Sequence, residues 1–188
     1  MPEAALFLID GVEETEAIAT ADVLRRGGVS LSLVSLKKEM DIKGKHNIVF
    51  SADELFETAQ NKDYQMLILP GGTTDFVQYP HFLSWLSAQH DAGKKIAAIC
   101  AAPFVLAKAG LLKDVKVTAF PAEDVRGALQ DAHAHIVEDA VVTDGNITTS
   151  RGPATALLFG VELLRILKGE TLAEKVAKDL QLNWLLKQ

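Results

Sequence analysis

The chain has a single cysteine among its 188 residues, Cys100. One cysteine rules out an internal disulfide framework, a Cys-X-X-Cys redox motif and a zinc site built from several cysteines. It also rules out a resolving cysteine in the same chain, so a disulfide at Cys100 would need a second chain or a small thiol. The chemistry open to this residue is that of a lone thiol.

The sequence is also short of positive charge and of long apolar runs. Its net charge is −6 and its isoelectric point is near 5.4, which argues against nucleic acid or an anionic membrane as the main partner. The longest apolar run, residues 96–107, has 12 residues, fewer than the ~20 needed to span a bilayer. The start of the chain lacks the basic residues and the longer apolar run of a signal peptide. We therefore expect a cytoplasmic protein.

The composition is that of an ordinary globular protein. Hydrophobic residues make up 48% of the chain and charged residues 23%, as in soluble domains. A chain of this length can bury a sizeable core. We therefore expect one domain over residues 1–188.

Apolar runs typical of strands alternate with helical patterns along the chain. Residues 1–36 predict one βαβ unit, with a strand at 4–9, a helix at 14–26 and a strand at 30–36. Further strands are predicted at 64–69, 96–99, 115–120, 135–138, 140–143 and 147–150, and further helices at 80–92, 101–109, 121–129 and 153–167. A small hairpin or excursion is predicted within 40–51. Capping-box patterns that begin at Ser51 and Thr171 predict a short helix to residue 59 and the last helix. This alternation predicts an α/β fold with a mostly parallel sheet.

Cys100 lies between the predicted strand at 96–99 and the predicted helix at 101–109. A sharp strand-to-helix turn is the geometry of a nucleophile elbow, which holds a reactive side chain at the mouth of a sheet. The N-terminus of a helix also stabilises a thiolate and lowers its pKa. The competing interpretation is a small buried hydrophobe, because free cysteine is among the most buried residue types.

Three segments follow predicted strands at the same edge of the sheet. They are residues 10–16, the pair Gly71-Gly72, and Cys100. Ligands of parallel sheets bind beyond the carboxyl ends of the strands, and paired glycines let backbone N–H groups point into a site. Acidic groups, backbone donors and the thiol can therefore converge at this edge, although no spacing argument alone places them within contact distance.

Three glutamates stand at the start of the helix predicted at 14–26. The helix dipole accounts for Glu13 and Glu14 without any further role. Glu16 could face the crevice, where proximity to a thiolate would raise its pKa and keep it protonated, able to donate a hydrogen bond.

Histidines and the segment after residue 149 are less informative. No histidine flanks Cys100, which argues against a cysteine peptidase. His133 and His135 could face one side of a strand, but no third ligand is apparent, so we assign no metal. The Ser150-Arg151-Gly152-Pro153 segment is either an anion-binding helix N-terminus assisted by Arg151 or an ordinary cap with proline in the first turn.

Five short motifs, taken in order, resemble the ThiJ/PfpI superfamily, in particular the subgroup of the parkinsonism-associated protein deglycase and its bacterial relatives. The motifs are Glu13-Glu-Thr-Glu16, Asp22-Val-Leu-Arg-Arg-Gly27, Leu69-Pro-Gly-Gly72, Ala97-Ala-Ile-Cys-Ala-Ala-Pro103 and Thr149-Ser-Arg-Gly-Pro153. Each is weak alone, but five in the right order are highly specific. The resemblance implies a flavodoxin-like three-layer sandwich of the class I glutamine amidotransferase-like type, and a homodimer with its site near the subunit interface.

The resemblance also assigns roles by position. Cys100 would be the nucleophile and redox centre, and Glu16 the protonated partner of its thiolate. The backbone of Gly71, Gly72 and Ala101 would supply an oxyanion hole. The substrate pocket would include His46, Phe120, Ser150, Arg151 and Pro153.

Departures from the family pattern narrow these expectations. Phe120 stands before Pro121 where several family members have a histidine, which removes a histidine acid–base step there. His46 stands where the hairpin often has an arginine. The peptidase-like branch has a histidine directly after the cysteine, whereas this chain has Ala101.

Two functions follow as hypotheses, and neither needs a cofactor or a metal. The first is an enzyme that uses Cys100 to act on small α-oxoaldehydes, converting methylglyoxal to lactate, or on their early glycation adducts. The alternative is a redox-sensing, protective or chaperone-like protein whose Cys100 is oxidised to the sulfinic acid, because no resolving cysteine diverts that oxidation. The expected partners are a small aldehyde or an oxidant, with no nucleic acid and no membrane.

Overall fold

A seven-stranded sheet runs through the centre of the computed structural model, which describes residues 3–185 without the side chains of residues 183 and 185. The strand order is β10-β11-β7-β6-β1-β2-β5. The strands are β1 (Ala4–Leu8), β2 (Leu31–Ser35), β5 (Glu54–Leu55), β6 (Met66–Leu69), β7 (Lys95–Ile99), β10 (Val141–Asp144) and β11 (Ile147–Ser150). Every neighbouring pair is parallel except β10 and β11. The predicted mostly parallel sheet is confirmed.

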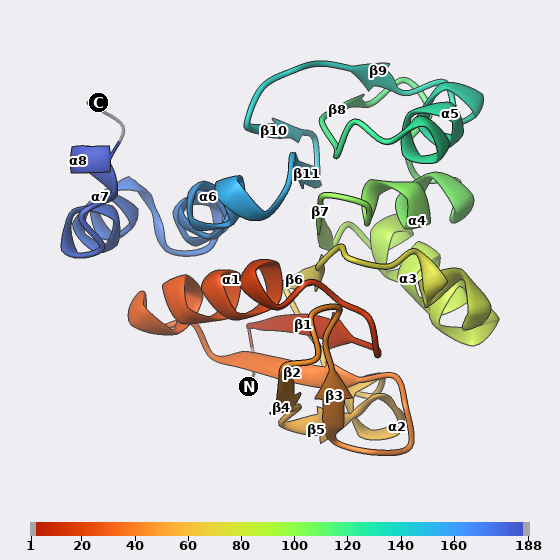
Figure 1. Cartoon of the computed structure of the whole chain (residues 1–188), viewed down its shortest axis with the longest axis horizontal. Coiled ribbons are helices and arrows are strands. Elements are labelled where there is room, and N and C mark those ends of the chain that lie inside the picture. Colours follow the sequence, from red (N-terminus) through yellow and green to blue (C-terminus); the bar gives the residue numbers. More distant parts are fainter. Residues whose placement is uncertain (1–2, 186–188) are drawn as a thin grey trace.

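Helices cover both faces of this sheet, which makes the fold a three-layer sandwich. The helices are α1 (Glu14–Arg26), α2 (Phe56–Ala59), α3 (Pro80–Asp91), α4 (Pro103–Lys108), α5 (Glu123–Asp131), α6 (Ala156–Lys168), α7 (Glu170–Asp179) and α8 (Leu182–Leu185), with 3₁₀ turns η1 (Asp75–Gln78) and η2 (Pro153–Thr155). Figure 1 shows α1, α6 and α7 together on one side of the sheet and α3 and α4 on the other. Among residues 3–185, no helix has the length and the apolar composition needed to cross a bilayer.

The central strands are apolar because both of their faces are covered. All residues of β1 and β6 are buried, as are all residues of β7 except Lys95. A strand buried on both sides has no solvent face and therefore no polar alternation. On the outer layer, Gly160 allows α6 to approach α1, since a Cβ at this position would lie 2.8 Å from the Cβ of Val23.

Two smaller sheets flank the main one. Strands β3 (Asp41–Lys43) and β4 (Val49–Ser51) form the predicted hairpin. Strands β8 (Lys116–Val117) and β9 (His135–Ile136) pair with each other in parallel, outside the main sheet. The strand predicted at 115–120 is therefore shorter than expected, and residues 118–120 lead toward the site instead.

Both helices predicted from capping boxes begin elsewhere. Ser51 ends β4, and its hydroxyl donates to Asp41 Oδ1 across the hairpin at 2.5 Å, so it does not cap a helix. Residues 54–55 form β5 beside β2, and α2 begins only at Phe56. Thr171 lies inside α7, whose N-cap is Gly169 with a φ of 91°. The Ser51 hydroxyl is used across the hairpin, and the left-handed Gly169 starts α7 one residue before Thr171.

Candidate active site

Cys100 occupies a strained turn directly after β7. Its φ is +65°, a left-handed value that side-chain-bearing residues rarely adopt. The turn is held on both sides, because the Cys100 N–H donates to Ser150 O and the Phe120 N–H donates to Cys100 O, each at 2.9 Å. The nucleophile elbow is therefore present, but α4 begins at Pro103 rather than at residue 101.

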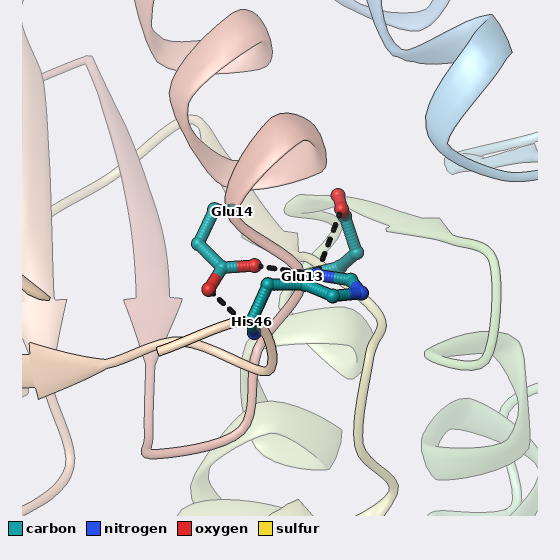
Figure 2. Close-up of side chains that lie close together, drawn as sticks. All are labelled: Glu13, Glu14 and His46. Atoms are coloured by element: carbon teal, nitrogen blue, oxygen red, sulfur yellow. Dashed lines mark hydrogen bonds and ion pairs between the residues drawn. The ribbon is translucent and has the colours of Figure 1, made fainter. Parts of the chain in front are cut away.

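The β3–β4 hairpin is fastened to the start of α1 by Glu14. One Glu14 carboxylate oxygen accepts from the N–H groups of His46 (2.7 Å) and Ile48 (3.3 Å), and the other lies 3.1 Å from His46 Nδ1. The His46 ring also lies 3.8 Å from Glu13 Oε1, so it bridges two carboxylates (Figure 2). These three residues are the group of potential metal ligands found among the described residues. Because both oxygens of Glu14 already have partners, we interpret the group as a hairpin anchor and assign no metal to it.

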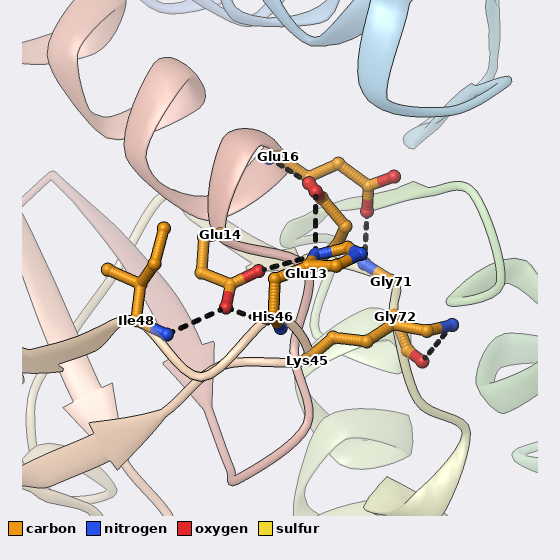
Figure 3. A network of polar contacts seen from close by, with 8 residues as sticks. All are labelled: Glu13, Glu14, Glu16, Lys45, His46, Ile48, Gly71 and Gly72. Atoms are coloured by element: carbon orange, nitrogen blue, oxygen red, sulfur yellow. Dashed lines mark hydrogen bonds and ion pairs between the residues drawn. The ribbon is translucent and has the colours of Figure 1, made fainter.

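Glu16 points inward from the first turn of α1 and is fully buried. Its Oε2 accepts the Gly71 N–H at 2.7 Å, while Glu13 caps α1 by accepting the Glu16 N–H at 2.8 Å (Figure 3). A Cβ at Gly71 would lie 2.7 Å from Cys100 Cβ and 2.8 Å from Glu16 Oε2. Gly71 therefore brings the carboxyl and the thiol together. Its N–H is engaged by Glu16, so the expectation that Gly71 donates to an oxyanion is corrected.

Burial controls the titration of this pair. Burial raises the pKa of Glu16 to about 7, although hydrogen bonding with Cys100 and Gly71 opposes the rise. Burial and then the charge of Glu16 raise the pKa of Cys100 to about 12. Two adjacent negative charges are unfavourable in a desolvated site, so the pair retains one shared proton at neutral pH. The expected lowering of the thiol pKa by a helix N-terminus is wrong, since α4 starts three residues later and has six residues.

Two backbone N–H groups nevertheless point at the thiol. Those of Gly72 and Ala101 hydrogen-bond to Cys100 and lower its pKa against the larger effect of burial. Gly72 has a φ of +88°, and a Cβ there would lie 2.3 Å from the Glu13 nitrogen, so only glycine fits. Paired donors of this kind can stabilise a negative oxygen that develops beside the sulfur.

A cavity of about 530 Å³ opens next to Cys100. Three residues expected in the pocket, His46, Phe120 and Pro153, line it. Two others do not, which corrects the expectation for them. Ser150 is buried and its hydroxyl donates to Ala140 O at 2.8 Å, and Arg151 forms an ion pair with Glu138.

The sequence missed several residues on the cavity wall. Lys45, Thr73, Thr74, Asp124 and Val125 all line it. Lys45 lies in the hairpin turn and reaches the cavity because Glu14 anchors the neighbouring residues. Its position next to His46 was the one signal in the sequence, and no local pattern showed that its side chain would line the cavity.

Comparison with known proteins identifies the family. The DJ-1/PfpI family model matches residues 2–166. DJ-1alpha of Drosophila melanogaster is 36% identical over 179 residues, covering 93% of this chain and 82% of that protein. The glutathione-independent glyoxalase DJR-1.2 of Caenorhabditis elegans is 29% identical, covering 95% and 96%. The structure of oxidized Toxoplasma gondii DJ-1 matches with a TM-score of 0.87 at 28% identity, covering 96% and 98%. The chain, with its flavodoxin-like sandwich and its cysteine elbow, belongs to the DJ-1/PfpI family.

Proposed function

We propose that the protein is a cofactor-free, cysteine-dependent enzyme that converts small α-oxoaldehydes to 2-hydroxy acids, with methylglyoxal giving lactate. The observation that carries the proposal is the placement of buried Glu16 and Cys100 on either side of Gly71. This pair supplies one nucleophile and one group that can move a proton, with two N–H donors beside them. A relative in C. elegans carries the name of a glutathione-independent glyoxalase.

The first step would be transfer of the shared proton to Glu16 and attack of the resulting Cys100 thiolate on the aldehyde carbon. The carbon–sulfur bond forms as the carbonyl electron pair moves onto oxygen, and the N–H groups of Gly72 and Ala101 hold the resulting alkoxide. Glu16 then delivers its proton to that oxygen and gives a hemithioacetal. Its raised pKa, about 7, suits it to both release and accept a proton near neutral pH.

The second step would be an internal redox isomerisation. The Glu16 carboxylate removes the proton from the former aldehyde carbon, and an enediol is reprotonated on the neighbouring carbon. The aldehyde carbon is thereby oxidised to a thioester and the ketone carbon is reduced to an alcohol. Water cleaves the thioester, releasing lactate and the thiol, so the net reaction adds one water and needs no external oxidant.

The size of the cavity supports a wider substrate range than methylglyoxal. A space of about 530 Å³ can also accept a larger adduct of the aldehyde, such as an early glycation product. Phe120, Val125 and Pro153 form an apolar wall for such a group. We therefore extend the proposal to deglycase-like cleavage of these adducts by the same thiol.

Formation of lactate from methylglyoxal by the purified protein tests the proposal. The wild type should form lactate. The Cys100→Ser variant should lose this activity, because the serine hydroxyl is much less acidic than a thiol and does not form the attacking anion. The Ser variant should fold normally, since Cys100 is one small side chain in a turn held by its backbone. Equal rates for the two proteins would refute the proposal.

The same thiol supports a second candidate function, oxidative-stress sensing. The chain has no second cysteine to trap a sulfenic acid, and a solved relative is the oxidized T. gondii DJ-1. Two equivalents of peroxide would convert Cys100 to the sulfinic acid and release two waters. Intact mass after mild peroxide should then rise by about 32 Da, two oxygen atoms, and an unmodified Cys100 would contradict this candidate.

An apolar face beside the site supports a homodimer. Ile18 on α1 and Ile48 and Val49 on the hairpin are 47%, 54% and 60% exposed. A groove of about 360 Å³ lies between α1 and the hairpin, lined by Ile18 and Phe50. Exposed apolar patches of this kind mark association surfaces. Sedimentation should show a dimer for the wild type and a monomer for Ile18→Glu, and a monomeric wild type would exclude this assembly.

A further inference from the structure

Lys45 places an ammonium group on the wall of the cavity that contains Cys100. Its Nζ donates to Gly72 O at 3.1 Å. Among the described residues, the lysines that form ion pairs are Lys37, Lys62, Lys94 and Lys168. Lys45 is not one of them, and its hydrogen-bond partner inside the protein is a neutral carbonyl. Its charge acts on buried Glu16 from a distance and lowers the pKa of that carboxyl.

The position of Lys45 is built into the fold. Its N–H donates to Val12 O at 2.9 Å, just before α1. The turn around it is closed by a Gly44 N–H to Ile48 O hydrogen bond at 2.9 Å and by the contacts of Glu14 described above. Figure 3 shows the side chain extended toward Gly72 and away from the carboxylates of Glu13 and Glu14. The ammonium group therefore lies beside the residue whose N–H faces the thiol.

The two acidic side chains that line the cavity, Glu13 and Asp124, both lie at helix N-termini. Glu13 accepts the Glu16 N–H at the start of α1, and its other oxygen lies 3.8 Å from the His46 ring. Asp124 lies in the first turn of α5, where the helix dipole favours a negative charge. The wall formed by Phe120 and Pro153 is uncharged. Among the described residues that line the cavity, Lys45 is the one lysine or arginine, so a ligand anion would bind at its ammonium group.

We propose that Lys45 is a specificity-determining residue that binds an anionic substituent, a carboxylate or phosphate, on an α-oxoaldehyde whose aldehyde carbon lies at Cys100. This inference rests on the proposed function and names its preferred substrate class. Aldehydes that carry such a group are favoured over methylglyoxal, and the carboxylate of a hydroxy-acid product is attracted to the same ammonium group.

Alkylation of Cys100 by a charged and a neutral reagent measures this preference without turnover. The ratio of the rate with iodoacetate to the rate with iodoacetamide should fall about fivefold in Lys45→Met, as expected for loss of one partly screened charge a few ångströms from the reagent. Lys45→Arg should keep the ratio, and high salt should reduce it in the wild type. Lys43→Met is the matched control, because Lys43 is an exposed hairpin lysine that does not line the cavity. The same ratio in wild type and Lys45→Met would overturn the proposal.

Anion binding to the Cys100→Ser variant gives a second measurement that does not depend on a reactive thiol. Lactate, inorganic phosphate and the neutral lactamide can be titrated by NMR. Lactate or phosphate should bind more tightly than lactamide, and adding Lys45→Met should abolish the difference. Whether lactate or inorganic phosphate binds more tightly indicates whether the preferred substrate carries a carboxylate or a phosphate. Equal binding of all three would refute the anion site even if methylglyoxal is turned over, whereas anion selectivity without turnover would refute only the proposed function.

Discussion

Replacing Glu16 by glutamine should change how the stability of the protein depends on pH. The amide has nearly the same shape, and its oxygen can still accept the Gly71 N–H that Glu16 accepts at 2.7 Å. What it loses is the ability to ionise. The expected effect is therefore electrostatic and can be separated from packing.

The magnitude follows from the raised pKa of Glu16, about 7 in the folded protein against an ordinary 4.5. Between these two pH values the folded state binds a proton that the unfolded state has lost. The free energy of unfolding therefore falls as pH rises through this window, by about 3 kcal/mol in all. The stabilisation is fully present below pH 4.5 and is lost above pH 7. Glu16→Gln cannot ionise and does not lose stability in this way. The free energy of unfolding of the variant, relative to that of wild type, should therefore increase by the same amount as the pH rises from 4.5 to above 7.

Urea unfolding followed by tryptophan fluorescence at pH 4.5 and pH 8 measures the difference. Glu14→Gln is the matched control, because hydrogen bonds to Glu14 lower its pKa and its contribution must have the opposite sign. Glu14 stabilises the folded protein at pH 8, and this stabilisation disappears as the pH falls through its folded pKa. Parallel pH curves for wild type and Glu16→Gln would refute the idea that burial keeps Glu16 protonated.

Three further predictions concern the same elements. The rate of Cys100 alkylation in wild type should rise in one step near pH 7 and again at much higher pH, because the pair loses two protons in turn; a single step at the ordinary thiol pKa would contradict a shared proton. Gly71→Ala should abolish lactate formation and alter this pH profile, since the new Cβ would lie 2.7 Å from Cys100 Cβ; wild-type kinetics would show that Glu16 and Cys100 are not held by Gly71. Gly160→Ala should lower the free energy of unfolding by about 1–3 kcal/mol through overpacking against Val23, and unchanged urea denaturation would show that α1 and α6 can separate at no cost.

The long elements were predictable because their pattern depends only on burial. A strand covered on both faces is apolar where it is buried, so β1, β6 and β7 can be recognised from the apolar residues 4–8, 66–69 and 96–99. The hairpin at 41–51 was also predictable, because Gly44 and Asn47 separate two short apolar pieces.

Short elements were not predictable in the same way. The Ser51 hydroxyl could cap a helix or donate a hydrogen bond to Asp41 across the hairpin. Only the pairing of β3 with β4 determines which of the two forms. The segment at 115–120 has strand-like composition, yet only residues 116–117 pair with β9. The next N–H groups have other partners, because Thr118 N–H donates to Thr149 Oγ1 and Phe120 N–H donates to Cys100 O.

The sequence alone determined the chemistry that this protein can use. One cysteine after a buried strand, an acid at the start of α1 and paired glycines after β6 all lie at the carboxyl edge of a parallel sheet, because that is where the three chain segments leave it. Only the tertiary structure decided how they act. It assigned the Gly71 N–H to Glu16, raised the pKa of the thiol by burial beside a carboxyl group, and brought Lys45 from a distant hairpin to Gly72. These outcomes depend on distances between residues far apart in the chain, and no local pattern of residues encodes such distances.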